Sequence, residues 1–177
     1  MSGALPVFGV TGWKNSGKTT LVAALIAEFV ARGYRVAAVK HAHHDFDIDH
    51  EGRDSHKYRL AGAREVAVVS ARRWALMTEL RNEPEPDLDA ILKHLEGSDL
   101  VLVEGFKGNP HPKIELRRLG ARRLDPIAPD FPGIVAIASD HPLGETNGLP
   151  VFDLNDVPGI ADFIASHLRL APRRLSA

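Results

Sequence analysis

The 177-residue sequence contains no cysteine, almost no net charge and no long hydrophobic run. Without cysteine the chain forms neither disulfides nor thiolate metal sites, which argues against an extracellular scaffold and favours the cytoplasm. A net charge of −1 gives no field that would attract nucleic acid or an anionic membrane as a main partner. No stretch approaches the roughly 20 apolar residues that span a bilayer. We therefore expect a cytoplasmic protein with neither nucleic acid nor membrane as a partner.

Hydrophobic residues make up 44% of the chain, which is enough for the core of one ordinary domain. We expect a single domain over residues 1–169 and a flexible tail over residues 170–177. Short apolar runs predict strands, and apolar residues three or four positions apart predict helices. Strands are expected at residues 7–11, 35–40, 65–70, 74–80, 100–103, 113–116 and 134–138, and helices at 19–32, 54–60, 88–95 and 157–168.

The order of these elements predicts the fold class. Strand, loop, helix and strand follow one another over the first forty residues, which indicates a right-handed βαβ unit. The continuous apolar runs at 100–103 and 134–138 suit a parallel sheet that is covered on both faces. The more polar segments that begin at Trp74 and Lys113 suit edge or antiparallel strands. The prediction is an α/β fold with a mostly parallel central sheet, helices on both faces and a few antiparallel edge strands.

The sequence GWKNSGKTT matches the phosphate-loop pattern of Gly, four residues and Gly-Lys-Thr. It lies between a strand and an amphipathic helix, where backbone N–H groups and the helix N-terminus surround phosphates. Lys18 would bridge the β- and γ-phosphates of a nucleotide, and the Thr19 hydroxyl would bind Mg²⁺. The architecture expected from this motif is the three-layer P-loop NTPase fold. The predicted binding loop comprises Gly12, Trp13, Lys14, Asn15, Ser16, Gly17, Lys18, Thr19 and Thr20.

Two side chains of this loop have more than one interpretation. Lys14 either reaches a phosphate or is an exposed loop lysine. The phosphate that it reaches could also lie across a dimer interface. Trp13 either shields the nucleotide site or covers a dimer interface.

A second strand of P-loop proteins supplies a carboxylate to the Mg²⁺ shell. The run LVLV at residues 100–103 is followed by Glu104, so we predict that Glu104 is this acid. Lys18 and Glu104 are therefore the predicted catalytic residues, and Thr19 and Glu104 are the predicted metal ligands. The alternative for Glu104 is a surface acid at a strand end. Asp99, at the opposite end of the strand, is expected to cap the preceding turn.

Residues 40–55, KHAHHDFDIDHEGRDS, concentrate four histidines and four aspartates in one segment. Three functional interpretations are open: a switch-like loop around the γ-phosphate and Mg²⁺, a transition-metal site, or a surface that receives another ligand. The fourth is a solvated polar loop. A zinc site is the weakest of these, because no histidine pair has helical i,i+4 spacing and no thiolate is present.

The usual guanine-reading sequence Asn-Lys-x-Asp is absent. Asp140 follows the strand at 134–138, where its carboxylate could accept hydrogen bonds from N1–H and the amino group of guanine, a donor pair that adenine lacks. The alternative is a turn residue close to Pro142. A basic segment beyond residue 104 could bind an anionic phosphate or the acidic surface of a partner; it contains Lys107, Lys113, Arg117 and Arg118.

The sequence resembles the molybdopterin-guanine dinucleotide biosynthesis adapter family, known as protein B of that pathway. The resemblance covers most of the chain and depends on GKTT (17–20), KHAHHDFDID with GRDS (40–55), RWALMTE (73–79), VEGFK (103–107) and PKIEL (112–116). It implies a dimeric, weakly hydrolytic GTP-binding α/β protein that assists a guanylyltransferase in attaching GMP to molybdopterin. Molybdopterin or its dinucleotide product is a further partner that it implies. It also implies that residues 12–20 and Glu104 form the site for GTP and Mg²⁺.

Two other functions compete with this interpretation. A small-molecule kinase or stand-alone NTPase would use the same phosphate loop, with a lid inside residues 105–132. A GTP-coupled metallochaperone would bind a transition metal through His41, His43 or His44.

Overall fold

The computed structural model describes residues 5–42, 46–128 and 130–173. The chain divides into two compact units, which are described separately below. The larger unit combines Met1–His41 with Leu88–Ala177, and the smaller unit is Ala42–Asp87. The single domain over residues 1–169 stays a prediction. None of the helices in the described residues is both long and apolar enough to span a bilayer.

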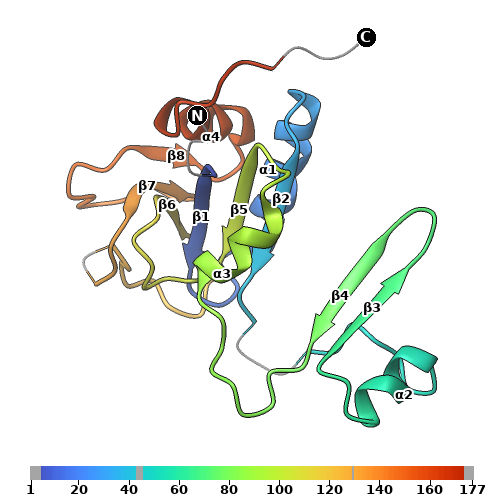
Figure 1. The fold of residues 1–177 in the computed structure, drawn as a ribbon. Helices are drawn as coiled ribbons and strands as arrows, with labels where there is room; N and C mark the ends of the chain where they lie inside the picture. The colour runs from blue at the N-terminus through green and yellow to red at the C-terminus, as the bar shows by residue number, and fades with distance from the viewer. Residues whose placement is uncertain (1–4, 43–45, 129, 174–177) are drawn as a thin grey trace. The chain divides into compact units, whose positions relative to one another are not determined.

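The larger unit is built on a six-stranded sheet with the strand order β2-β5-β1-β6-β7-β8 (Figure 1). Every neighbouring pair in this sheet is parallel. The predicted fold class is confirmed, but the antiparallel strands form a separate two-stranded sheet instead of edges. The six strands are β1 (Val7–Gly12), β2 (Val36–Lys40), β5 (Leu100–Glu104), β6 (Lys113–Arg117), β7 (Ile134–Ser139) and β8 (Val151–Asp153). The three-residue β8 was not predicted, because it is too short to show a periodic pattern.

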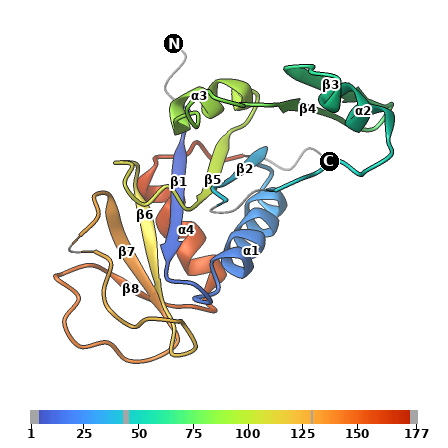
Figure 2. The same cartoon turned by 90° about the horizontal axis from the view of Figure 1, so that it is seen from below.

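Helices cover both faces of the sheet and complete the three layers (Figure 2). On one face, α1 (Lys18–Ala31) and α4 (Val157–His167) pack on the side chains of Phe8, Leu102 and Ile114, among others. On the other face, α3 (Leu88–Leu92) and the 3₁₀ turn η1 (Lys93–Leu95) pack on Val101 and Val103. Successive residues of β5 point to opposite faces, so one apolar run supplies both cores.

Gly33 lies just after the C-terminal end of α1 and closes the helix. Gly33 has a φ of 86°, in the left-handed region that glycine adopts without a Cβ clash. Tyr34 N donates to Phe29 O at 3.0 Å, and Gly33 N donates to Val30 O at 2.9 Å. This is the Schellman pattern, which satisfies the last carbonyls of a helix.

The position predicted for the segment at Lys113 was wrong. β6 is an interior parallel strand between β1 and β7, although it contains two fully buried charged residues. Lys113 Nζ donates to Asn109 O at 2.5 Å and to Pro132 O at 2.8 Å, and burial lowers the pKa of Lys113 to about 8. Glu115 accepts from Ile127 N at 2.7 Å and pairs with Arg117 at 3.0 Å. Buried charge is tolerated here because these partners are provided.

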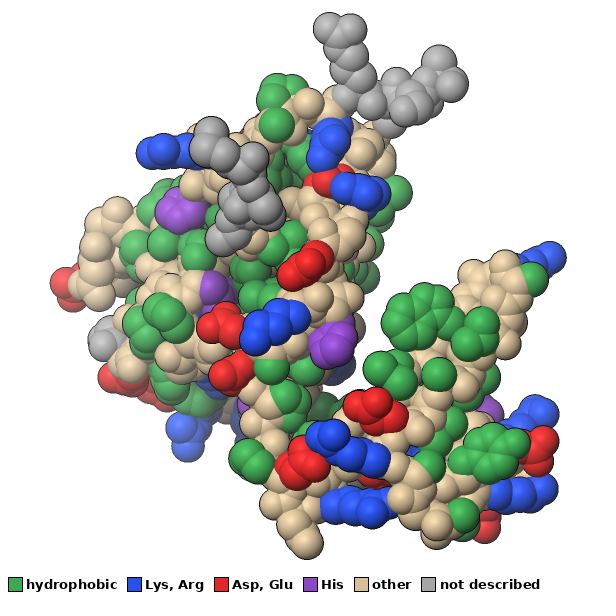
Figure 3. Space-filling model, viewed as in Figure 1, with side chains coloured by type: hydrophobic (Ala, Val, Ile, Leu, Met, Phe, Trp, Pro, Cys, Tyr) green, Lys and Arg blue, Asp and Glu red, His purple; other side chains and the backbone are tan. Residues whose placement is uncertain are grey.

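The smaller unit contains α2 (Asp54–Leu60) and an antiparallel hairpin of β3 (Glu65–Val69) and β4 (Trp74–Thr78). The antiparallel pairing expected for the Trp74 segment is confirmed. Apolar side chains gather over this hairpin in Figure 3. Trp74 is 70% exposed and Val69 is 75% exposed.

Polar contacts join residues 171–173 to Tyr34, before β2, and to Asp99, before β5. Asp99, at the start of β5, accepts hydrogen bonds from Arg35 N at 2.9 Å and from the Arg35 guanidinium at 3.0 Å. These hydrogen bonds lower the pKa of Asp99 to about 2. Within residues 170–173, Arg173 pairs with Asp99 and Ala171 O accepts from the Tyr34 hydroxyl at 3.0 Å. Asp99 thus forms its hydrogen bonds and ion pairs at the start of β5, whereas Glu104 lies at the end of the same strand.

Candidate functional site

The predicted phosphate loop connects the end of β1 to the start of α1. A Cβ on Gly12 would overlap the Ser16 hydroxyl and lie 3.0 Å from Leu116 O, so only glycine fits where the loop closes on itself. Asn15 and Gly17 have φ values of 66° and 89°, which turn the backbone before the helix. The hydroxyl of Ser16 is buried without a hydrogen-bond partner in the described residues. A polar atom left unpaired in this loop is consistent with a loop built around a ligand.

Lys18 curls back over this loop. Its ammonium group donates to Trp13 O at 2.8 Å and to Gly12 O at 3.1 Å. Burial lowers the pKa of Lys18, and the nearby carboxylate of Glu104 acts against this decrease. A phosphate oxygen would compete with neutral carbonyls for a half-buried cation, and charge-assisted hydrogen bonds are the stronger kind.

The structure brings the two predicted metal ligands together. Thr19 Oγ1 lies 3.1 Å and 3.0 Å from the two carboxylate oxygens of Glu104, although 85 residues separate them in sequence. Lys40 Nζ lies 3.8 Å from the same carboxylate. Adjacent β1 and β5 end at the same edge of the parallel sheet, which explains this meeting.

A hydroxyl and a carboxylate oxygen are suitable ligands for Mg²⁺, which keeps several waters and phosphate oxygens in its shell. No group of three or more His, Asp or Glu residues that could hold a metal occurs in the described part of the chain. The described residues therefore fit a metal site in which the protein supplies two ligands and a nucleotide and water supply the others.

The residues after Glu104 fix how the chain leaves β5. Gly105 has a φ of 100°, and a Cβ there would lie 2.7 Å from the Cβ of His41. The next residue, Phe106, stacks on the His41 ring with 4.5 Å between centroids. His41 N also donates to Glu104 O at 2.9 Å. His41 thus packs against the strand end that presents the acid.

Trp13 contacts residues that sequence analysis did not connect with it. Its Nε1 donates to Asp125 O at 2.7 Å, and the next loop residue, Lys14, accepts from Arg122 N at 2.9 Å through its carbonyl. The Lys107 ammonium lies 4.5 Å and the Arg123 guanidinium 5.1 Å from the centre of the indole ring. The Lys14 side chain is exposed. These contacts join segments about 110 residues apart, and only the strand order β5-β1-β6 could have indicated them.

Asp140 lies directly after β7, as predicted. Its carboxylate accepts from Leu119 N at 3.1 Å and contacts His141 Nδ1 at 2.8 Å, and the His141 contact lowers the pKa of Asp140. Arg118 Nε lies 3.6 Å from this carboxylate, while Arg118 Nη1 lies 3.8 Å from the position of a Cβ on Gly17. Arg118 therefore stands between the phosphate loop and Asp140. Base recognition by Asp140 stays a prediction.

The four cations predicted as one basic segment separate into two pairs. Lys107 and Arg118 lie beside the phosphate loop. Lys113 is buried in β6, and Arg117 pairs with Glu115 at 3.0 Å with 9% of its side chain exposed. Lys113 and Arg117 are thus structural partners inside the sheet.

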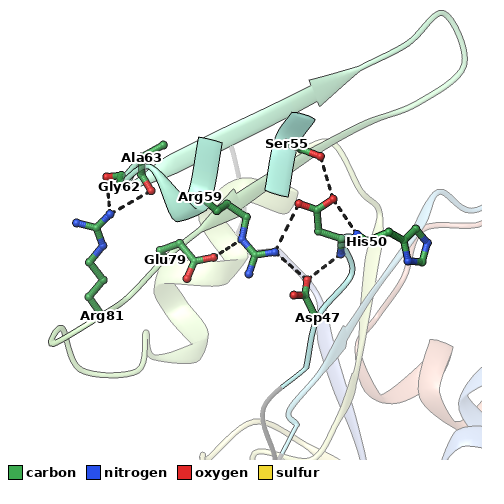
Figure 4. Close-up of polar contacts among 9 residues, drawn as sticks. Asp47, His50, Ser55, Arg59, Gly62, Ala63, Glu79 and Arg81 are labelled. Carbon is green, nitrogen blue, oxygen red and sulfur yellow. Dashed lines mark hydrogen bonds and ion pairs between the residues drawn. The ribbon is translucent and has the colours of Figure 1, made fainter. Parts of the chain in front are cut away.

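In the smaller unit, Arg59 of α2 gathers three carboxylates (Figure 4). Arg59 Nη1 lies 2.8 Å from Asp47 and 3.5 Å from Asp49, and Arg59 Nε lies 2.5 Å from Glu79. Hydrogen bonds to Asp47 and then Glu79 raise the pKa of Arg59. The network joins the DFDID segment to the end of the RWALMTE segment.

The same network shapes the loop before α2. Asp49 Oδ1 accepts from Ser55 Oγ at 2.9 Å and from His50 N at 3.0 Å, and Asp47 accepts from Asp49 N at 2.8 Å. Two of the segment's aspartates are thus engaged inside the smaller unit. His43, His44 and Asp45 lie outside the described residues. The switch, metal and ligand-surface interpretations stay predictions.

The parallel sheet, the loop after β1 and the acid at the end of β5 are consistent with the α/β fold of P-loop NTPases. A family model of molybdopterin guanine dinucleotide synthesis protein B, MobB, matches residues 7–140. The chain belongs to this family.

Relatives and solved structures agree with this assignment. The chain is 43% identical over 168 residues to the molybdopterin-guanine dinucleotide biosynthesis adapter protein of Escherichia coli (strain K12), covering 93% of this chain and 94% of the relative. It is 41% identical over 171 residues to the protein of the same description in Haemophilus influenzae, covering 95% and 92%. The crystal structure of a MobB homologue from Bacillus stearothermophilus superposes with a TM-score of 0.71 and 30% identity, over 93% of this chain and 99% of that one.

Proposed function

We propose that this chain is a GTP-binding adapter that assists a guanylyltransferase in converting molybdopterin to molybdopterin-guanine dinucleotide. The family supports the adapter role. The nucleotide site rests on one observation above all, the convergence of Lys18, Thr19 and Glu104 at the ends of β1 and β5. The proposal places this function in the cytoplasm, as the cysteine-free sequence predicts.

In this proposal each residue has a defined task toward a triphosphate. The backbone N–H groups of the phosphate loop and the N-terminus of α1 bind phosphate oxygens. The Lys18 ammonium moves from the loop carbonyls to the β- and γ-phosphates. Thr19 and Glu104 supply a hydroxyl and a carboxylate to Mg²⁺, which would offset the phosphate charge when bound. Arg118, at the end of β6, would face the nucleotide between the phosphates and the base.

The preference for guanine rests on Asp140 and on the family. Asp140 follows β7, two strands away from the phosphate loop, and a carboxylate there could accept from the N1–H and amino group of guanine. Its present partners, Leu119 N and His141, hold the side chain at this strand end.

Turnover of GTP by the isolated chain is expected to be slow. Glu104 is engaged by the Thr19 hydroxyl and lies near Lys40, and Lys107 and Arg118 beside the loop are cations that do not accept a proton from water. A P-loop protein that lacks part of its catalytic apparatus hydrolyses roughly 10³ to 10⁵ times more slowly than the completed site. The proposal therefore assigns the chain a weak GTPase activity at most.

Glu104→Gln tests the metal role of the acid. The amide keeps the size of the side chain and can still contact Thr19, but it removes the charge that Mg²⁺ requires. We expect GTP affinity to fall about tenfold in the presence of Mg²⁺ and to change little with excess chelator. Isothermal titration in the two buffers measures both constants. Equal losses with and without Mg²⁺ would assign Glu104 a structural role instead.

A homodimer is part of the proposal, and the smaller unit provides a surface for it. A two-stranded hairpin is marginally stable in water unless its apolar face is covered. One face of the described hairpin exposes Val69, Trp74 and Leu76 by 42% to 75%. A second copy brings the same apolar face and satisfies two-fold symmetry. Sedimentation equilibrium is expected to give twice the mass of the 19.3 kDa chain, and Trp74→Glu to reduce it. A single-chain mass at micromolar concentration would contradict the dimer.

A further inference from the structure

The indole of Trp13 carries two cations on one ring. The Lys107 ammonium lies 4.5 Å and the Arg123 guanidinium 5.1 Å from the ring centre. Lys107 follows β5 and Arg123 follows β6, so both flank the phosphate loop that ends β1. Neither cation forms an ion pair with any carboxylate among residues 5–42, 46–128 and 130–173. Both cations thus lie near the same indole ring, and neither is neutralised by a carboxylate in these residues.

The ring that holds these cations is itself fixed. Trp13 Nε1 donates to Asp125 O at 2.7 Å, and Arg122 N donates to Lys14 O at 2.9 Å, so the segment after β6 is attached to the phosphate loop at two points. The quadrupole of the indole ring attracts a cation over its face, which favours the observed position of each cation. The arrangement is therefore organised before any ligand binds.

These cations are additional to those that a triphosphate requires. Lys18 and the backbone N–H groups serve the β- and γ-phosphates, while Thr19 and Glu104 serve Mg²⁺. Lys107 is close enough to Lys18 to lower the pKa of that residue, and burial lowers the pKa of Lys107 itself. Lys107 is partly buried and Arg123 is exposed, and unpaired charge of one sign at such a place favours binding of a counter-ion.

We propose that Trp13, Lys107 and Arg123 form a second anion subsite beside the phosphate loop, which takes a phosphate monoester while a nucleotide occupies the loop. Several oxygens on one phosphorus can accept from an ammonium and from a planar guanidinium together, and arginine suits such multidentate contacts. The phosphate of a pterin cofactor belongs to this chemical class. That identification rests on the proposed adapter function, whereas the subsite itself rests on the three side chains.

Inorganic phosphate is the probe for this subsite, and Trp13 is the reporter. The chain has two tryptophans, so Trp74→Phe leaves Trp13 as the only indole. We expect phosphate to change the emission of Trp13 in protein saturated with Mg²⁺ and a non-hydrolysable GTP analogue, because the anion draws the cations from the ring. Arg123→Gln and Lys107→Gln should each weaken phosphate binding about tenfold, the value of one charge-assisted hydrogen bond.

Arg122→Gln is the matched control, because it removes a guanidinium from the neighbouring position that does not contact the ring. It should change phosphate affinity by less than about twofold. Equal effects of Arg122→Gln and Arg123→Gln would show binding to diffuse charge and would overturn the subsite. A response to phosphate that disappears when the analogue fills the loop would overturn it too, because the phosphate would then have occupied the loop itself.

Two further outcomes separate this inference from the proposed function. Normal binding of the GTP analogue without any phosphate response refutes the subsite and leaves the nucleotide site intact. Failure of the analogue to bind refutes the nucleotide proposal, and the Arg123→Gln comparison in nucleotide-free protein then still decides the subsite. Binding of polyglutamate, sensitive to the same substitutions, in place of phosphate would show a surface for an acidic protein and would overturn the phosphate assignment.

Discussion

Lys18→Ala is expected to weaken binding of Mg²⁺ and GTP on the order of 100-fold while the chain stays folded. In the proposed nucleotide complex this lysine is the cation over the triphosphate, and a charge-assisted hydrogen bond contributes about 1.5–3 kcal/mol. Among the described residues its ammonium donates only to the loop carbonyls of Gly12 and Trp13, so little of the core depends on it.

Isothermal titration measures this loss, and thermal unfolding checks the fold. Lys14→Ala is the control, because it makes the same substitution at an exposed position of the same loop. It should change the GTP affinity by less than about threefold. Micromolar affinity retained in Lys18→Ala would mean that the nucleotide binds elsewhere. A large loss in Lys14→Ala would assign that lysine the phosphate contact that we propose for Lys18.

The second large effect is expected from Arg59→Met in the smaller unit. The methionine keeps much of the packing volume but leaves Asp47, Asp49 and Glu79 close together without their shared cation. Like charges repel, and the loop before α2 loses the group that joins it to β4. Amide exchange in residues 46–55 should become about tenfold faster or more, while the six-stranded sheet keeps its protection.

Arg64→Met provides the comparison for this experiment. Arg64 pairs with Glu83 at 2.8 Å, but the two side chains are 61% and 52% exposed, and such surface pairs contribute little. Exchange in residues 46–55 should not change in this variant. Unchanged exchange in Arg59→Met would show that the three-carboxylate network does not order the loop. The switch and ligand-surface interpretations of that segment would then both stay open.

The parallel sheet was predictable because its strands are continuous apolar runs joined to a phosphate-loop motif of fixed context. The run LVLV before Glu104 indicated both the buried strand and the acid that meets Thr19. The position of β6 was not predictable, because Lys113 and Glu115 are polar in sequence and become acceptable in the core only through partners such as Pro132 O and Ile127 N.

The environment of Trp13 depends on the strand order and not on local pattern. Nothing near Trp13 in sequence indicates Lys107, Arg123 or Asp125, because these residues reach it from the ends of neighbouring strands. The motif at residues 40–55 shows the converse case. Its residues were identified readily, but their pairing depends on Arg59 and Glu79, which carried no signal of their own in a single sequence.

We propose that this chain acts through nucleotide held by its phosphate loop to increase formation of the dinucleotide. The most direct measurement reconstitutes molybdopterin-guanine dinucleotide from molybdopterin, GTP, Mg²⁺ and the guanylyltransferase, and compares the intact chain, Lys18→Ala and no addition. We predict a higher yield with the intact chain alone, with Lys18→Ala giving the yield of the reaction without added chain. Equal yields in all three reactions would contradict the account, as would phosphorylation of a small molecule by this chain alone at tens of turnovers per second, on the order of a working kinase.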